Sequence, residues 1–172
     1  VQAGVAGAEV WQQHGSLQES LVELEENIRV LVMGVRGEEH REGQLGAHLE
    51  TVIRALHKPV LVVNSPFAVP KKVMLAYDGH DASRKALDMV ASSPVFKGIP
   101  CHLVYVGDEA VASGVLNEAA TVLAVAGISH ELVNLPKGKS DEQLCQYQAE
   151  NDIGLTVMGA YSHHPLRGML LG

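Results

Sequence analysis

The sequence has few aromatic residues and no long apolar run. Phe, Trp and Tyr make up 4% of its 172 residues, although 47% of the chain is hydrophobic. A buried core must therefore be built from Val, Leu, Ala and Met, as is usual where helices cover a parallel sheet. No apolar run approaches the ~18 residues that a membrane span needs, and no signal peptide is visible. We therefore expect no membrane partner.

Basic residues and cysteines are also scarce. The chain has 13 Lys and Arg against 20 Asp and Glu, a formal net charge of −7, so it lacks the basic footprint of a nucleic-acid-binding protein. Cys101 and Cys145 lie far apart and form neither a C-x-x-C motif nor a metal-ligand pattern. This composition predicts a reduced, cytoplasmic setting with no metal site and no nucleic-acid partner.

A strand–turn–helix pattern occurs twice in the chain. Residues 155–158 are mostly apolar and typical of a buried strand, and an apolar helical pattern begins after Pro165. Residues 30–46 repeat this arrangement: when Val32 is aligned with Val157, Gly34 falls on Gly159 and Gly37 on Ser162. A supersecondary unit that recurs at domain-length spacing predicts a duplicated domain.

Strand and helix patterns alternate from residue 72 onward. Strands are expected at 73–77, 101–106, 130–135 and 155–158, each followed by a helix. This order predicts an open, doubly wound parallel α/β sheet with helices on both faces. The fifth strand is missing, and residues 60–63 of the first repeat show what it would be. Residues 64–72, NSPFAVPKK, contain two prolines, so we divide the chain into units 1–64 and 72–172 with a linker at 65–71.

The turn after the first strand of the second unit has more than one interpretation. Asp78 and Gly79 form a typical turn pair, and Asp78 is as well suited to capping the next helix as to binding a ligand. Asp81 or Ser83 can also cap that helix. Ser83 has no His or Asp partner at a recognisable spacing, so the sequence predicts no nucleophile and no catalytic residue.

Four segments together carry the pattern of a known family. They are VMLAYDG at 73–79 followed by Ala86 and Leu87, LVYV at 103–106, GAYS at 159–162 followed after nine residues by Gly172, and HKPVLVV at 57–63. In this order, they resemble four features of the universal stress protein family: its first strand and helix, its second strand, its phosphate-binding signature G-x-x-G-x9-G-[S/T], and its closing strand. The resemblance covers nearly the whole chain. It implies tandem domains of this family, each with a five-stranded parallel sheet of the adenine nucleotide α-hydrolase-like type.

The ATP-binding members of this family imply roles for five residues. Asp78 would contact the ribose or adenine, and the backbone of Val106 would meet the adenine. Gly159, Ser162 and Gly172 would line the phosphates of ATP, bound with Mg²⁺. Glycines let backbone amides approach phosphate oxygens, and the N-terminus of the following helix favours negative charge. This site is expected at the carboxyl ends of the strands.

Departures from the signature leave the function open. Ser162 replaces the second glycine, and in the first repeat Gly46 comes one residue early, with Ala47 where a hydroxyl is expected. We therefore favour the second unit as the nucleotide site. The first hypothesis is a stress-response protein that uses ATP occupancy as a switch. The alternative is a nucleotide-independent dimeric scaffold, and a weaker alternative is an ATP-hydrolysing enzyme. The resemblance also implies that the two domains pair through their edge strands, mimicking a homodimer.

Overall fold

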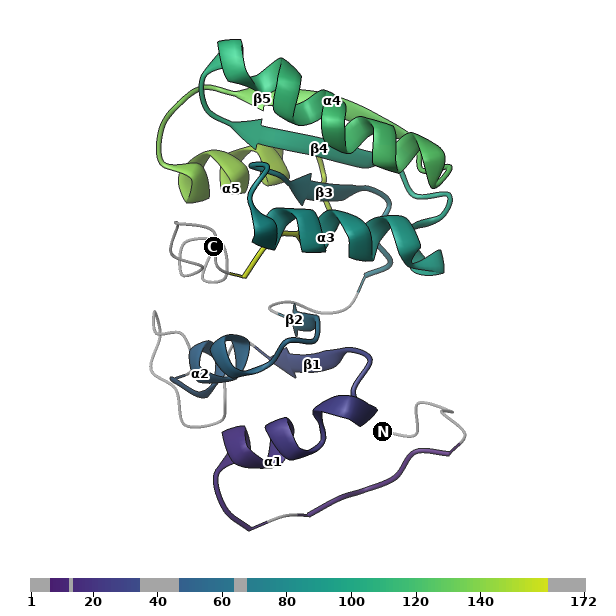
Figure 1. Ribbon diagram of the computed structural model, residues 1–172, viewed down its shortest axis with the longest axis vertical. Coiled ribbons are helices and arrows are strands. Elements are labelled where there is room, and N and C mark those ends of the chain that lie inside the picture. The colour runs from purple at the N-terminus through teal and green to yellow at the C-terminus, as the bar shows by residue number, and fades with distance from the viewer. Residues whose placement is uncertain (1–6, 13, 35–46, 64–67, 161–172) are drawn as a thin grey trace.

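The computed structural model describes residues 7–12, 14–34, 47–63 and 68–160. Figure 1 shows two α/β parts that follow one another along the chain, each with its own parallel sheet. The first sheet has two strands and the second has four. Among the described residues, no helix is both long enough and apolar enough to cross a membrane.

The first sheet pairs β1 (Leu31–Gly34) with β2 (Val60–Val63) in parallel. Before β1 come α1 (Leu17–Glu23) and the 3-10 turn η1 (Glu25–Asn27), and α2 (Ala47–Ala55) lies between the strands in sequence. Helix α2 covers one face of the sheet with an apolar contact formed by Leu49, Ile53, Met33, Val60 and Val62. The opposite face carries Val32, Leu61 and Val63, which are exposed by 61%, 39% and 39%. Within the described residues this face is apolar and uncovered.

The second sheet contains the predicted site. Its elements are β3 (Val73–Ala76), α3 (Asp81–Ser92), the 3-10 turn η2 (Pro94–Phe96), β4 (Cys101–Val106), α4 (Glu109–Val125), β5 (His130–Leu135), α5 (Ser140–Glu150) and β6 (Leu155–Val157). All strands are parallel, in the order β5-β4-β3-β6. The predicted strands at 101–106 and 130–135 are confirmed to the residue. A fifth strand is not present among the described residues, and the helix expected after Pro165 lies outside them.

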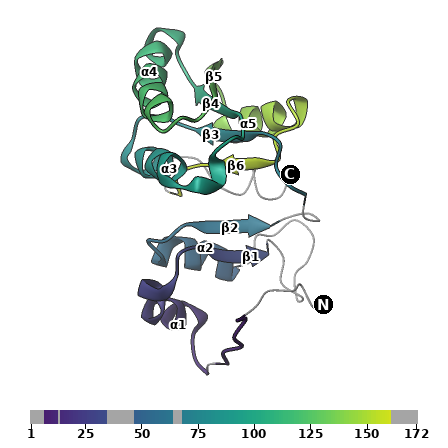
Figure 2. The same cartoon turned by 90° about the vertical axis from the view of Figure 1, so that its right-hand side faces the viewer.

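Helices cover both faces of the second sheet, as predicted. Figure 2 shows α3 and α4 on one side and α5 on the other. The alternation of side chains along β3 explains this arrangement. Val73 and Leu75 of β3, and Tyr77 just after it, are buried among side chains of α3 and α4. Met74 faces the other way, into a smaller cluster that includes Leu144 of α5. Two-residue periodicity therefore gives β3 two buried faces, as expected for a central strand of a parallel sheet.

Helix α3 does not begin as predicted. Its N-cap residue is His80, which makes no side-chain capping bond, and Asp81 is the first residue of the helix. Ser83 points back to Asp78, with its Oγ atom 2.6 Å from Asp78 Oδ1. The expectation that Asp81 or Ser83 caps α3 is therefore wrong. A hydrogen bond to a charged carboxylate is stronger than one to a neutral backbone group, so Ser83 is drawn toward Asp78.

Candidate functional site

Three of the five predicted site residues lie at the carboxyl ends of neighbouring strands. Asp78 lies two residues beyond β3, Val106 ends β4, and Gly159 lies two residues beyond β6. The strand order reverses at β3, because the chain proceeds to β4 and β5 on one side of it and returns to β6 on the other. In open α/β sheets, ligands bind outside the carboxyl ends of the strands at this kind of switch point. Ser162 and Gly172 lie outside the described residues.

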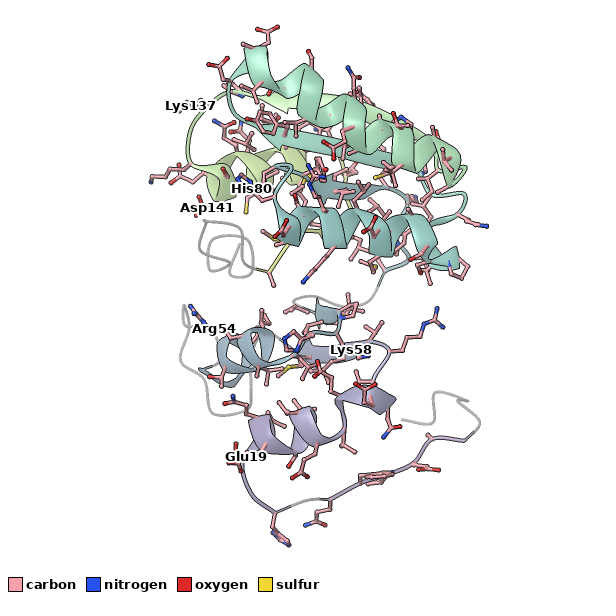
Figure 3. The ribbon with its side chains drawn as sticks, viewed as in Figure 1. Glu19, Arg54, Lys58, His80, Lys137 and Asp141 are labelled. Atoms are coloured by element: carbon pink, nitrogen blue, oxygen red, sulfur yellow. The ribbon has the colours of Figure 1, made fainter. Side chains whose placement is uncertain are left out.

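Polar side chains from other loops reach the same edge. Figure 3 shows His80, which follows β3, on the same side of the second sheet as Lys137 and Asp141. Lys137 and Asp141 come from the connection between β5 and α5 and from the first turn of α5. The edge therefore combines the Asp78 carboxylate close to the strands with an imidazole, an ammonium group and a second carboxylate, that of Asp141, around it.

Gly159 lies so close to α3 that a side chain would not fit. A Cβ atom at this position would be 2.6 Å from the carbonyl carbon of Ala82 and 2.7 Å from its Cβ atom. Contacts under about 3 Å force the backbone to move, and Ala82 belongs to the first turn of a packed helix. The glycine is therefore required by the approach of β6 to α3. This steric role exists without a ligand.

Gly107 follows Val106, and the atoms nearest to it are the movable end of a side chain rather than the helix backbone that lies beside Gly159. A Cβ atom at Gly107 would lie 2.6 Å from the hydroxyl oxygen of Tyr105. The backbone N–H of Gly107 donates to the carbonyl oxygen of Leu135 at 3.0 Å, which continues the pairing of β4 with β5. The end of β4 is therefore held in place by its neighbouring strand, and Val106 is half-buried there.

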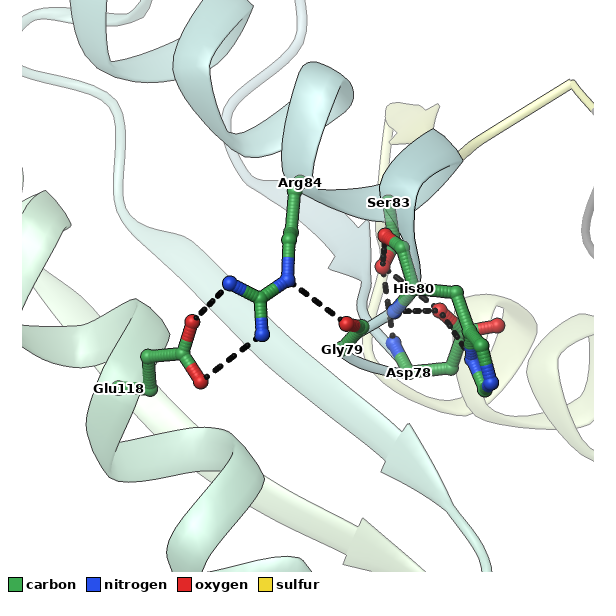
Figure 4. A network of polar contacts seen from close by, with 6 residues as sticks. All are labelled: Asp78, Gly79, His80, Ser83, Arg84 and Glu118. Atoms are coloured by element: carbon green, nitrogen blue, oxygen red, sulfur yellow. Dashed lines mark hydrogen bonds and ion pairs between the residues drawn. The ribbon is translucent and has the colours of Figure 1, made fainter.

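Asp78 is the centre of a polar network that holds the turn after β3 (Figure 4). Its Oδ1 atom accepts from Ser83 Oγ at 2.6 Å and from the backbone N–H of His80 at 3.0 Å, and it lies 3.3 Å from Nδ1 of His80. The backbone N–H of Asp78 donates to Ser83 Oγ at 3.3 Å. Ser83 is 2% exposed, so this bond pattern is fixed in the interior. Asp78 thus organises the turn, but it does not cap α3 as one of the two sequence interpretations expects, because the N-cap residue is His80.

The network also keeps Asp78 ionised. Partial burial by itself would raise the pKa of this carboxyl group, but the hydrogen bonds from Ser83 and His80 and the charge of the His80 ring outweigh it, so the pKa is lowered. The side chain remains 35% exposed. A carboxylate of this kind can accept a hydrogen bond from a ligand hydroxyl or amine.

Ser83 has an Asp partner that sequence spacing did not reveal, so the expectation that it has none is wrong. The arrangement is still not that of a nucleophile. The Ser83 hydroxyl is buried and bonds to the carboxylate, while the imidazole of His80 contacts the carboxylate rather than the hydroxyl. A serine nucleophile needs an adjacent base and an exposed oxygen. Within the described part of the chain, no group of three or more His, Cys, Asp or Glu residues could hold a metal ion.

Sequence analysis missed the ion pair next to this turn. Arg84 pairs with Glu118 of α4, with Nη1 at 2.7 Å from Oε1 and Nη2 at 3.3 Å from Oε2. The Nε–H of Arg84 donates to the carbonyl oxygen of Gly79 at 2.8 Å. Burial and the nearby charge of Glu118 raise the pKa of Tyr77, whose hydroxyl is buried without a hydrogen-bond partner among the described residues. The sequence has no spacing rule that would pair Arg84 on α3 with Glu118 on α4.

Comparison with known proteins agrees with this arrangement. No family model matches the chain. The chain is 36% identical over 178 aligned positions to universal stress protein Slr1230 of Synechocystis, an alignment that covers 99% of this chain and 61% of that protein. Over nearly its whole length, the chain is thus similar to a universal stress protein. It spans 61% of the length of this universal stress protein relative.

The fold is also found among solved universal stress proteins. A universal stress protein from Archaeoglobus fulgidus superposes with a TM-score of 0.68 at 21% sequence identity, covering 81% of this chain and 53% of that one. At this level of identity the likeness shows the fold. The predicted α/β class with parallel sheets is thereby confirmed.

Proposed function

We propose that this chain is a universal stress protein that binds ATP, with Mg²⁺, at the carboxyl edge of its second sheet, and that occupancy acts as a switch in a cytoplasmic stress response. One observation supports the proposal: Asp78, Val106 and Gly159 lie at or just after the carboxyl ends of three neighbouring strands, where the strand order reverses. Such a point is where nucleotide ligands bind in open α/β sheets.

Each residue has a chemical role in this proposal. Asp78 is an ionised acceptor for a ribose hydroxyl or an adenine amine. The backbone at Val106 meets the adenine, and Gly159 allows the main chain to approach the phosphates. Ser162 and Gly172, which follow in sequence, are proposed as further phosphate contacts through backbone N–H groups and the serine hydroxyl.

The switch follows from differential binding. A nucleotide that contacts the 159–172 segment favours the conformations of this segment that fit the phosphates. A partner that binds the same edge of the sheet then meets a different surface in the occupied and empty states. The occupied fraction at a given ATP concentration sets how strongly the population shifts.

We further propose that residues 1–64 are the second half of one five-stranded domain, 65–71 the linker, and 72–172 most of a second domain, with the two domains paired through edge strands. The internal repeat supports this division. Val157 is 8% exposed, whereas Val32, its equivalent in the first repeat, is 61% exposed. Val157 is covered by the cluster that α3 and α4 form, so the same cover is expected over Val32 in a complete domain.

A nucleotide-independent scaffold is the second candidate function. Two observations favour it, because Asp78 is already bonded within its turn and Gly159 is required by its contact with Ala82. Both residues therefore have a structural reason to be present without ATP. The two proposals differ in what the purified protein contains and binds.

The deciding experiment uses protein purified without added nucleotide. The protein is denatured, and any released ligand is identified by chromatography and mass spectrometry. Stoichiometric ATP or ADP is the expected result, with loss of the ligand in Asp78→Ala and Gly159→Val. Lys97→Ala, an exposed substitution after η2 and away from the edge, is the matched control and is expected to retain the ligand. An empty wild-type protein that shows no thermal shift with ATP and Mg²⁺ would move the conclusion to the scaffold.

A further inference from the structure

Arg84 connects the turn at residues 78–80 to helix α4. It is the fourth residue of α3, and its backbone N–H donates to the carbonyl oxygen of His80 at 2.9 Å. Its side-chain Nε–H donates to the preceding carbonyl oxygen, that of Gly79, at 2.8 Å. The two remaining nitrogens bind the Glu118 carboxylate in a bidentate arrangement (Figure 4). Arg84 thus bonds to two carbonyl groups of the turn and to α4, the helix beside α3 on the same face of the sheet.

The turn needs this external support because glycine occupies its centre. Gly79 has a φ angle of +79°, in the left-handed region that side chains disfavour. Glycine also has more conformational freedom to lose than any other residue. The methyl groups of Val115 on α4 approach within 3.6 Å of the position a Cβ atom would take. Since Gly79 has no side chain of its own, its carbonyl oxygen is the group by which Arg84 can fix the turn.

The ion pair is better suited to positioning than to stabilising the fold. Both side chains are about half exposed, 52% for Arg84 and 48% for Glu118. Exposed ion pairs contribute little to folding stability. A bidentate arginine–carboxylate pair nevertheless fixes the orientation of the guanidinium plane. Glu118 therefore sets the direction in which the third donor of Arg84 points, which is toward Gly79.

We infer that Arg84 is a positioning residue of the nucleotide site, acting through the Gly79 carbonyl and oriented by Glu118. This inference rests on the proposed function and adds the residue that fixes the turn. Ser83 holds the carboxylate of Asp78 from one side, and Arg84 holds the carbonyl groups that follow it from the other. Fixing both sides keeps Asp78 in one orientation before ATP arrives, which lowers the ordering cost of binding.

The test compares ATP affinities of folded variants by isothermal titration calorimetry with ATP and Mg²⁺. Arg84→Met removes all side-chain donors and is expected to weaken ATP binding roughly tenfold, the loss typical of a hydrogen bond to a charged group. Arg84→Lys retains one donor and is expected to recover part of the affinity. Lys85→Met is the matched control, because it removes the same charge from the next, exposed position of α3 without touching the turn.

A second pair of variants separates positioning from charge. Arg84→Met leaves Glu118 uncompensated near an anionic ligand, which alone could weaken binding. The double variant Arg84→Met with Glu118→Gln removes that charge and is expected to remain as weak as Arg84→Met. In spectra of ¹⁵N-labelled protein without nucleotide, the Gly79 amide signal is expected to shift or broaden in Arg84→Met and to stay unchanged in Lys85→Met.

The outcomes are distinguishable. Wild-type protein that binds no ATP would overturn the proposed function, and this inference with it. Wild-type protein that binds ATP while Arg84→Met binds equally well would overturn the inference alone. Full recovery of affinity in the double variant would also overturn it, since the effect would then be one of charge.

Discussion

Ser83 Oγ lies 2.6 Å from Asp78 Oδ1 and also accepts the backbone N–H of Asp78 at 3.3 Å. The buried hydroxyl therefore holds both the side chain and the main chain of a residue that lies two positions beyond the first strand of the second sheet. This pair connects the fold to the proposed site, because the same bonds that shape the turn keep the Asp78 carboxylate ionised.

Ser83→Ala is expected to lower the free energy of unfolding by about 1–2 kcal/mol at pH 7, because it removes a buried donor to a charged group. Urea unfolding measures the change, and the exposed Ser113→Ala on α4 is the control with little expected effect. A loss of the same size in both variants would contradict the role assigned to Ser83.

The pH dependence of this effect has a defined sign. The pKa of Asp78 is lower in the folded protein than in the unfolded chain. Its contribution to stability is therefore fully present above the unfolded value, about pH 4, and is lost as the pH falls through the folded value. The difference between wild type and Ser83→Ala should shrink as the pH falls below about 4 and through the lowered pKa of folded Asp78, where the carboxyl group binds a proton. A difference that grows on acidification would contradict this account.

Gly159→Ala and Gly114→Ala are expected to have opposite effects. A Cβ atom at Gly159 would collide with the backbone of Ala82, so we expect a loss of about 1–3 kcal/mol. Gly114 lies in α4 with no atom within 4 Å of the added Cβ atom. Alanine there should stabilise the protein by about 0.5–1 kcal/mol. Thermal unfolding of both variants tests the pair, and a tolerated Gly159→Ala would show that β6 does not approach α3 this closely.

His102 and Tyr147 join β4 to α5 through a hydrogen bond of 2.7 Å. His102 is 6% exposed, so Tyr147→Phe leaves a buried ring nitrogen without its partner. We expect a loss of about 1–3 kcal/mol in urea unfolding. A double-mutant cycle with His102→Leu should give a coupling energy of at least about 0.5 kcal/mol. Additive effects of the two substitutions would mean that the bond contributes nothing.

The two cysteines are expected to differ in reactivity. Burial raises the pKa of Cys101 to about 11, so at pH 8 almost none of it is thiolate. Cys145 is only partly buried, and that burial and the charge of Asp141 raise its pKa. Alkylation of the native protein at pH 8 should label Cys145 before Cys101, and both should react in guanidinium chloride. Mass spectrometry of the labelled peptides identifies the order, and faster labelling of Cys101 would be inconsistent with its burial.

Local patterns in the sequence were sufficient to predict most of the strands. The strands at 101–106 and 130–135 have the predicted bounds, and 60–63 is also a strand. The first and last of these are mostly apolar runs between turn residues, and 130–135 mixes polar and apolar residues in an alternating pattern. The predicted ends of two other strands were less accurate. The strands predicted at 73–77 and 155–158 each end one residue earlier, at Ala76 and at Val157.

The candidate site was predictable where it depends on the strand ends and not where it depends on tertiary contacts. Asp78, Val106 and Gly159 could be placed at one edge because parallel strands present their carboxyl ends together. The bonds from Ser83 to Asp78 and from Arg84 to Gly79 and Glu118 depend on how α3 starts and how α4 packs beside it. A single sequence contains no spacing rule for such contacts. The nucleotide-binding roles of Asp78, Val106, Gly159, Ser162 and Gly172 all stay predictions.

The most direct test of nucleotide binding at this edge is a titration of ¹⁵N-labelled protein with ATP and Mg²⁺, followed through backbone amide signals. The account predicts saturable shifts at Gly79, Gly107 and Gly159, which lie at the carboxyl ends of β3, β4 and β6. Val73 and Cys101, at the amino ends of the first two of these strands, should show no shift. Absence of any shift at saturating ATP, or shifts confined to the amino ends, would contradict it.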